Sequence, residues 1–268
     1  MSALAALKIC DILLGKFFAQ EGEADLTPLG PCLHGWPPEL EKGEVGGAGY
    51  YNDLLGEVLT FSLPPVATCP GATDFCRRVC YVKKIPPYIR RVYEDNYIRF
   101  LRDPKGFVSW VFEDMMVKWR IGQRRPPGSA RLRKPPWRPM PKLVRLHVSG
   151  DFFSEEYVEA WYTIAKDLMP DFRFWAYTRS WRVPSLKNAL ERLRSLPNVT
   201  IYASTDPETG PPPPGWLEAG FEGRTYRPAK LCTYDAQERA GVPKERRVYC
   251  RECGYCAEGR GDVMWAWE

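Results

Sequence analysis

Three short apolar segments decide the fold: LVRLHV (residues 143–148), FRFWAY (172–177) and VTIYA (199–203). Each is rich in β-branched or aromatic residues, as strands are. Ser154 is the expected N-cap of a helix over residues 155–168, and a second helix is predicted over residues 185–196. Strands and helices that alternate in this way predict parallel strands joined by helical crossovers, and therefore an α/β fold.

The pattern extends on both sides of this core. A strand is predicted over residues 57–63, helices over residues 88–102 and 107–119, and a last strand over residues 263–267. We therefore divide the chain into three parts: an N-terminal helix with a Pro- and Gly-rich linker (1–56), a βα core (57–210) and a cysteine-rich C-terminal segment (211–268).

The composition is that of a globular protein, with 268 residues of which 44% are hydrophobic and 26% charged. The sequence has no long uncharged apolar run and no basic leader. We therefore expect no transmembrane helix, no membrane partner and a cytoplasmic location. The chain has 26 prolines but few asparagines and glutamines, a bias typical of thermophiles.

Positive charge is concentrated in one stretch. The formal net charge is +5, and residues 118–145 contain ten lysines and arginines and no acid. Because prolines interrupt this stretch, we interpret it as a basic loop or insertion. It favours an anionic partner such as nucleic acid or an anionic substrate, and the alternative is a solvated loop without a partner.

Seven of the nine cysteines fall into two groups, which are Cys69, Cys76 and Cys80, and then Cys232, Cys250, Cys253 and Cys256. Disulfides are disfavoured because no secretory signal is present, although thermophiles are an exception. The closing Cys-x2-Cys-x2-Cys run resembles ferredoxin spacing, in which a distant fourth cysteine completes a [4Fe–4S] cluster. Cys232 is the natural fourth ligand, and zinc is the alternative metal at these four residues.

The first group is a triplet without a fourth cysteine nearby. A structural zinc site is rarely short of a ligand, whereas a [4Fe–4S] cluster held by three thiolates leaves one iron open to a small molecule. Alternatively, Cys232 closes this site, or one of the only two histidines does, His34 or His147.

Polar residues follow three of the predicted strands, and the triplet follows a fourth. These polar residues are Ser149-Gly150-Asp151, Thr178-Arg179-Ser180 and Ser204-Thr205-Asp206. Because sites in α/β proteins form at the carboxyl ends of parallel strands, we expect all four strand ends to share one site. The alternative is that each side chain only caps the helix that follows it.

A cysteine triplet after the first strand and a Gly-acid pair after a later strand resemble the radical S-adenosylmethionine (SAM) enzymes. More closely, the segments TCPGATDFCRRVCY, HVSGDFFSEEYVEAW and FWAYTRSW are similar to a phage and prokaryotic family known as gene product eighty-eight. The resemblance covers residues 60–256 and includes the closing cysteine run. The triplet spacing, Cys-x6-Cys-x3-Cys, is longer than the usual Cys-x3-Cys-x2-Cys, and Ser-Gly-Asp stands where Gly-Gly-Glu is usual.

The resemblance implies a partial βα-barrel and a radical-SAM-like redox enzyme that needs an electron donor. The triplet would hold a [4Fe–4S] cluster that binds SAM, Gly150 and Asp151 would meet the amino group of SAM, and the C-terminal cysteines would hold an auxiliary cluster. We expect Asp151 and Arg179 to be catalytic, with Arg179 orienting an anionic substrate. Further cofactor contacts are expected from Ser149, Thr178, Ser180, Ser204 and Asp206.

Two other classes of protein fit the same residues. One is a nucleic-acid-binding protein without catalysis, in which clusters or zinc stabilise the fold. The other is a structural protein stapled by zinc or disulfides. The fold alone does not choose between these classes and the enzyme.

Overall fold

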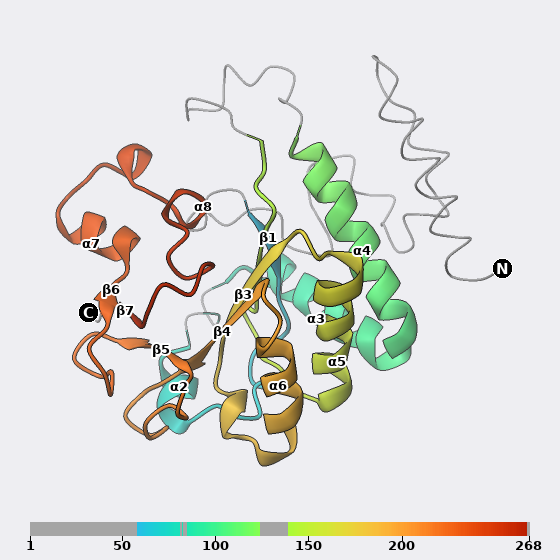
Figure 1. Ribbon diagram of the computed structural model, residues 1–268, viewed down its shortest axis with the longest axis horizontal. Helices are drawn as coiled ribbons and strands as arrows, with labels where there is room; N and C mark the ends of the chain where they lie inside the picture. Colours follow the sequence, from blue (N-terminus) through green and yellow to red (C-terminus); the bar gives the residue numbers. More distant parts are fainter. Residues whose placement is uncertain (1–57, 81, 83–84, 124–138, 267–268) are drawn as a thin grey trace. The chain divides into compact units, whose positions relative to one another are not determined.

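The structure is a computed structural model that describes residues 58–80, 82, 85–123 and 139–266 (Figure 1). The chain forms two compact units, residues 1–46 and 47–268, and every described residue belongs to the second unit. The predicted N-terminal helix, Cys10, Cys32 and His34 lie outside the described residues. None of the helices in the described part is both long and apolar enough to cross a membrane.

A single parallel sheet organises the second unit. Its seven strands lie in the order β1-β2-β3-β4-β5-β7-β6, and every pairing between them is parallel. The strands are β1 (Leu59–Phe61), β2 (Leu143–Leu146), β3 (Arg173–Thr178), β4 (Val199–Ser204), β5 (Leu217–Phe221), β6 (Lys230–Leu231) and β7 (Val263–Trp265). The predicted α/β class with parallel strands is confirmed. The pairing establishes a sheet with β1 and β6 at its edges, and it does not establish the predicted barrel curvature.

The α-helices of the described part are α2 (Asp74–Arg78), α3 (Pro87–Arg102), α4 (Pro104–Ile121), α5 (Glu155–Thr163), α6 (Lys187–Arg194), α7 (Thr233–Arg239) and α8 (Cys250–Cys253). Of these, α3 to α6 follow the predicted segments with small shifts at their ends, whereas α2, α7 and α8 are not predicted. Ser154 caps α5 as expected, because its side chain accepts a hydrogen bond from the Tyr157 amide. The predicted helix over 155–168 ends in a short π-helical turn, Ile164–Leu168.

Side chains on the strands alternate between two covered faces, as the period of two requires. On one face Val144, Leu146, Phe174 and Ala176 join the large core under α3 to α6. On the other face Trp175 packs with the C-terminal segment. Figure 1 shows α3 to α6 on one side of the sheet and α7 and α8 on the other.

The C-terminal segment is thus part of the sheet as well as a cover for it. It contributes β5, β6 and β7, and the cysteine-bearing residues between β6 and β7 lie over the second face. The segment therefore forms one structure with the βα core.

The predicted basic insertion begins inside α4 and ends inside β2. Lys118 is buried in α4, where its Nζ lies 2.6 Å from the Asp114 carboxylate. Arg145 lies in β2, with its guanidinium carbon 4.3 Å from the Tyr177 ring centroid. Lys118 and Arg145 therefore already have partners inside the fold. Residues 124–138 of the stretch lie outside the described part.

Candidate metal centres

The cysteine triplet lies in the loop that follows β1, and a short helix within that loop carries its middle member. Thr73 caps this helix, α2, by accepting a hydrogen bond from the Cys76 amide at 3.0 Å. The Thr73 hydroxyl also donates to Asp206 Oδ2 at 2.7 Å. The position of Cys76 is therefore fixed by the end of β4, where Asp206 lies.

Arg179 connects the ends of β3 and β4. Its Nε donates to Asp206 Oδ2 at 3.0 Å, and its side chain is only 15% exposed. Asp206 is fully buried, so one carboxylate accepts hydrogen bonds from both Thr73 and Arg179 away from water. A charge-assisted pair in such surroundings holds both partners in one geometry.

Asp151 makes the corresponding link between β2 and β3. Its carboxylate accepts hydrogen bonds from the Thr178 hydroxyl, from the Arg179 amide at 2.8 Å and from the Phe152 amide at 2.7 Å. Burial raises the pKa of Asp151, and these hydrogen bonds oppose that shift. Asp151 thus orders the strand-end loops around the triplet.

Two glycines allow the loops to come this close. A Cβ on Gly71 would lie 2.0 Å from the Arg179 carbonyl oxygen, and one on Gly150 would lie 2.6 Å from the Leu63 Cβ. Gly150 also has a φ of +78°, a conformation that favours glycine. The triplet loop can therefore lie against the ends of β2 and β3 only without side chains at these two positions.

The three thiols of the triplet lie near one another, and two of them, Cys69 and Cys76, lie near charged residues at the strand ends. Burial raises the pKa of Cys69 to about 12, and the nearby Asp151 carboxylate and the other two thiols add to the shift. Burial also raises the pKa of Cys76, which the Arg179 guanidinium opposes. Without a bound cation, Cys69 and Cys76 therefore favour the neutral thiol form, and Arg179 is the positive group that faces Cys76.

The remaining predicted strand-end residues serve the same junction. The Ser149 hydroxyl donates to the Leu63 carbonyl at 2.8 Å and thereby ties β2 to the loop after β1. The Ser180 amide donates to the Thr178 hydroxyl at 2.9 Å, and the Ser204 carbonyl accepts from the Trp181 indole at 3.3 Å. The four strand ends therefore meet in the structure as predicted, and many of the polar groups there are hydrogen-bonded to one another.

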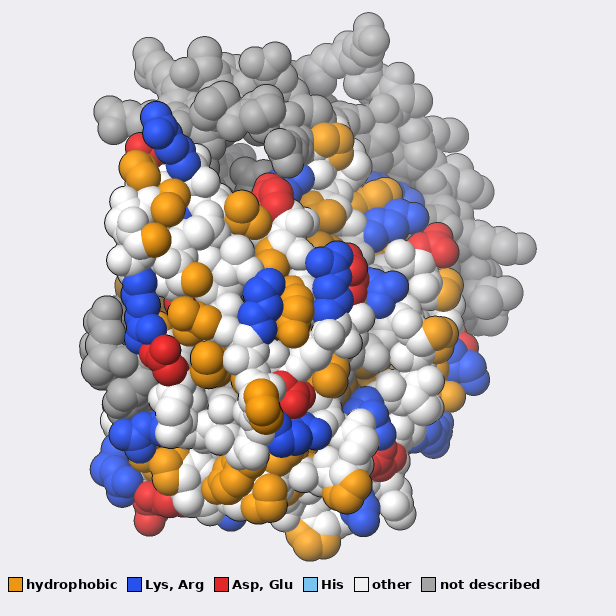
Figure 2. All heavy atoms as spheres, turned by 60° about the vertical axis from the view of Figure 1, so that its left-hand side comes forward, with side chains coloured by type: hydrophobic (Ala, Val, Ile, Leu, Met, Phe, Trp, Pro, Cys, Tyr) orange, Lys and Arg blue, Asp and Glu red, His pale blue; other side chains and the backbone are white. Residues whose placement is uncertain are grey.

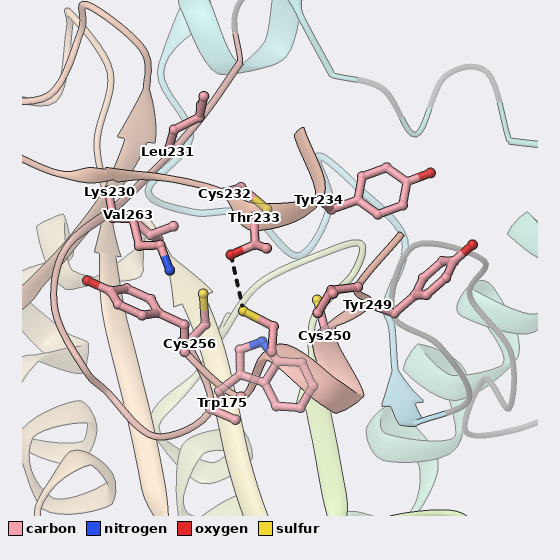
Figure 3. A pocket seen from close by; sticks show the side chains of 15 residues that line it. Trp175, Lys230, Leu231, Cys232, Thr233, Tyr234, Tyr249, Cys250, Cys256 and Val263 are labelled. Atoms are coloured by element: carbon pink, nitrogen blue, oxygen red, sulfur yellow. Dashed lines mark hydrogen bonds between the residues drawn. The ribbon is translucent and has the colours of Figure 1, made fainter. Parts of the chain in front are cut away.

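The second cysteine group lines one pocket between the sheet and the C-terminal segment. All four cysteines contribute to its wall, together with Trp175, Lys230 and Tyr255. Figure 3 shows the side chains of Cys232, Cys250 and Cys256 turned toward one space, although they come from separate points of the chain. The Cys253 sulfur lies 3.4 Å from the Thr233 hydroxyl at the same place. Cys232 thus belongs with the C-terminal run and does not complete the triplet.

Burial also dominates the electrostatics of this pocket. It raises the pKa of Cys250 to about 12 and that of Cys256 to about 11, and the neighbouring thiols add to both shifts. Arg145 opposes the shift at both cysteines, and a hydrogen bond from Tyr177 opposes it at Cys256. Four half-buried thiols beside a positive side chain form a donor set that suits a soft metal or an iron–sulfur cluster.

No group of three or more cysteine, histidine or acidic side chains among the described residues is arranged around a point where one metal ion would bind. The four thiols of a zinc site lie about 2.3 Å from one shared ion. A cubane cluster spreads its four thiolates over the corners of a larger body, so its ligands stand farther apart.

Sequence reasoning did not find several residues that lie beside the two cysteine groups. Thr73, Arg145, Trp175, Tyr177 and Tyr202 each lie within a loop or strand where nothing marks a functional side chain. The one usable signal is the alternation in FRFWAY, because it places Trp175 and Tyr177 on the same face of a strand that has apolar residues on both faces. His147, proposed as a possible ligand, lies instead against Phe152 and Tyr157 on the helix side, with its Nε2 2.9 Å from the Tyr157 hydroxyl.

The fold and the two sites define a class: a parallel α/β protein with one cysteine group at the carboxyl ends of its strands and another on the sheet face opposite α3 to α6. A family model described as Gene product 88 matches residues 39–257, and the chain belongs to this family. The Gene 88 protein of Mycobacterium phage L5 is 28% identical over 233 residues, which cover 80% of this chain and 89% of the relative. That of Mycobacterium phage D29 is 28% identical over 237 residues with the same coverage. No solved structure matches the chain.

Proposed function

We propose that this protein is an iron–sulfur enzyme of the radical-SAM-like type, with a reactive [4Fe–4S] cluster at the triplet and an auxiliary cluster at the C-terminal cysteines. The observation that carries the proposal is the gathering of seven cysteines into two groups, one of three and one of four, each beside a partly buried arginine side chain. Three thiolates leave one iron open, whereas four complete a cubane.

The place of the triplet supports a reactive role. It lies where the carboxyl ends of β1 to β4 meet, which is the usual position of a site in a parallel α/β sheet. In the proposal the sheet is part of an incomplete βα-barrel, and SAM binds at the open iron within reach of Gly150 and Asp151. The cluster would supply the electron for SAM cleavage, and an external electron donor would then return an electron to the cluster.

Asp151 and Arg179 have distinct roles in this proposal. Asp151 accepts three hydrogen bonds in a buried position, so it orders the loops that surround the bound cofactor. Arg179 faces Cys76 and contacts Asp206, so its guanidinium would offset the negative charge of the cluster and orient an anionic substrate.

The basic stretch would serve the same enzyme by attracting that anionic substrate or a nucleic acid. Most of its contribution would come from residues 124–138, which hold six of the ten bases, because Lys118 and Arg145 are held inside the fold. On the face shown in Figure 2, lysine and arginine side chains of the described part are scattered among apolar and acidic ones.

The test is electron paramagnetic resonance of the reduced protein, purified without oxygen, before and after addition of SAM. We expect a cluster signal that changes with SAM and is lost in Cys76→Ala, while the SAM-independent signal of a second cluster is lost in Cys253→Ala. SAM cleavage that persists in Cys76→Ala would contradict the assignment of the triplet as the reactive site.

A further inference from the structure

The sheet face under the C-terminal segment carries buried hydrogen-bond donors that have no partner. Arg145 Nε, Trp175 Nε1 and the Tyr202 hydroxyl are shielded from solvent and meet no acceptor in the part of the chain that the structure describes. A buried donor left unpaired destabilises the fold, so three of them near one another call for an explanation.

The strand register brings the three donors together. Arg145 of β2 lies opposite Trp175 of β3, and Tyr177 of β3 lies opposite Tyr202 of β4. Trp175 and Tyr177 are two residues apart and therefore point to the same face. Adjacent strands lie about 4.8 Å apart, so the donors occupy one small area of the sheet.

This area adjoins the pocket that holds the four cysteines. Trp175 lines the pocket, and Cys250 and Cys256 pack against its hydrophobic cluster. Tyr202 lies next to the pocket, in a cluster against which Cys232 and Cys256 pack. Figure 3 shows the Trp175 indole directly beside the sulfur atoms. The positive charge of Arg145 acts on the thiols of Cys250 and Cys256.

Two of the four thiols already have donors. Tyr177 donates to Cys256, and backbone amides of Tyr234 and Asp235 donate to Cys232. A zinc ion would add no acceptor, because its four positions are filled by the thiolates. A cubane cluster adds inorganic sulfides, each of which accepts hydrogen bonds from N–H and O–H groups.

We propose that Arg145, Trp175 and Tyr202 form a donor set for a sulfide-bearing cluster in this pocket, and that they raise its reduction potential. The inference rests on the proposed function, and it names iron–sulfur over zinc for the C-terminal cysteines. Reduction adds negative charge to a cluster that is already anionic. Donors and a positive guanidinium stabilise the reduced form more than the oxidised form.

The experiment uses the full chain with Cys69, Cys76 and Cys80 replaced by alanine, so that only the C-terminal pocket binds a cluster. Iron, acid-labile sulfide and zinc are counted first, and the reduction potential is then measured by a redox titration followed by electron paramagnetic resonance. The variants are Trp175→Phe, Tyr202→Phe and Arg145→Lys, which remove donors and keep most of the volume. Trp161→Phe is the matched control, because Trp161 is equally buried but lies in the core on the helix side.

We expect Trp175→Phe and Tyr202→Phe to shift the potential to more negative values and Trp161→Phe to leave it unchanged. In the variant that combines Trp175→Phe with Tyr202→Phe, the equilibrium constant for reduction should fall at least tenfold, which is about 59 mV for one electron. Bound iron and sulfide with unchanged potentials would overturn this inference and leave the proposed function standing. Zinc without sulfide would overturn both.

A second measurement covers the case in which a variant fails to retain its cluster. Electron–nuclear double resonance of the reduced protein with intact Trp175 and Tyr202, after exchange into D2O, should detect deuterons coupled to the cluster. The absence of any coupled exchangeable deuteron would contradict the donor set without use of a variant.

Discussion

At the scale of single residues, the triplet site depends on places where side chains are missing. Gly71 leaves no room for a Cβ, because the Arg179 carbonyl oxygen occupies that space, and its own carbonyl accepts a hydrogen bond from Arg182 at 3.0 Å. The loop that carries Cys69 and Cys76 is thereby held against the end of β3.

We predict that Gly71→Ala displaces this loop and lowers the iron bound at the triplet by at least half, while the C-terminal cluster is retained. Gly223→Ala is the control, because Gly223 has a φ of +69° and an added Cβ would meet no atom within 4 Å. It strains its own backbone by about 1 kcal/mol but displaces nothing. Equal iron in Gly71→Ala and Gly223→Ala would contradict the close approach.

A second residue-scale prediction concerns His147. Burial lowers the pKa of His147 to about 3, with the Arg145 charge as a further cause. The unfolded chain binds a proton at this residue below about pH 6.5 and the folded chain does not, so stability falls as the pH drops from 6.5 toward 3.

We therefore expect His147→Gln to remove part of the loss in the free energy of unfolding between pH 7 and pH 5. The linkage amounts to about 2 kcal/mol at pH 5. Chemical denaturation of the two proteins at both pH values measures it, and His34→Gln, which changes the only other histidine, is the control. A pH dependence in His147→Gln equal to that of the unsubstituted protein would show that His147 is not buried in the neutral form.

At the scale of elements, α2 is a five-residue helix that carries Cys76 and sets its position in the site. Thr73 both caps α2 and donates to Asp206, so it couples the helix to the end of β4. Its loss leaves a buried carboxylate with one donor fewer.

We predict that Thr73→Ala destabilises the protein by about 1–2 kcal/mol and also weakens iron retention at the triplet. Ser154→Ala is the matched control, because Ser154 caps α5 in the same way but takes no part in either cysteine group. The free energy of unfolding should fall in both variants, and iron loss on dilution into chelator should increase only in Thr73→Ala. An equal rate of iron loss in both would refute the coupling.

The elements also show how far the sequence leads. The strands over 143–148, 172–177 and 199–203 are predictable because apolar β-branched and aromatic residues are dense there. β5 is not predictable, since its LEAGF sequence holds Glu218, which is fully buried and accepts hydrogen bonds from Thr205, Tyr226 and Arg227. β6 has two residues and gives no pattern at all.

The two sites also differ in how far the sequence predicts them. The meeting of the strand ends follows from parallel topology, so Asp151, Arg179 and Asp206 can be named from the sequence as neighbours. The covering of the second sheet face by the C-terminal segment depends on tertiary packing. Nothing in the local sequence of Arg145 or Tyr202 therefore indicates that they meet the C-terminal cysteines.

At the scale of the whole molecule, the C-terminal cysteines connect elements that are distant along the chain. Cys232 directly precedes α7, and Cys250 and Cys253 lie in α8, while β7 follows and pairs with both β5 and β6. A cluster in this pocket would tie the edge of the sheet together.

We predict that Cys253→Ala lowers the midpoint of thermal unfolding by roughly 5–10 °C, equivalent to about 2–3 kcal/mol for a chain of this size. Cys80→Ala should lower it less, because the triplet lies in one loop and holds no strands together. Calorimetry of both variants under exclusion of oxygen measures the difference. A larger loss in Cys80→Ala would reverse the assignment of the structural centre.

The most direct test of the central claim is the content of iron, acid-labile sulfide and zinc in the protein purified without oxygen. The account predicts about eight irons and eight sulfides per chain, because each of the two [4Fe–4S] clusters holds four of each. Both numbers should fall to about four in the variant without the triplet cysteines. Zinc in place of iron, with no acid-labile sulfide, would contradict it.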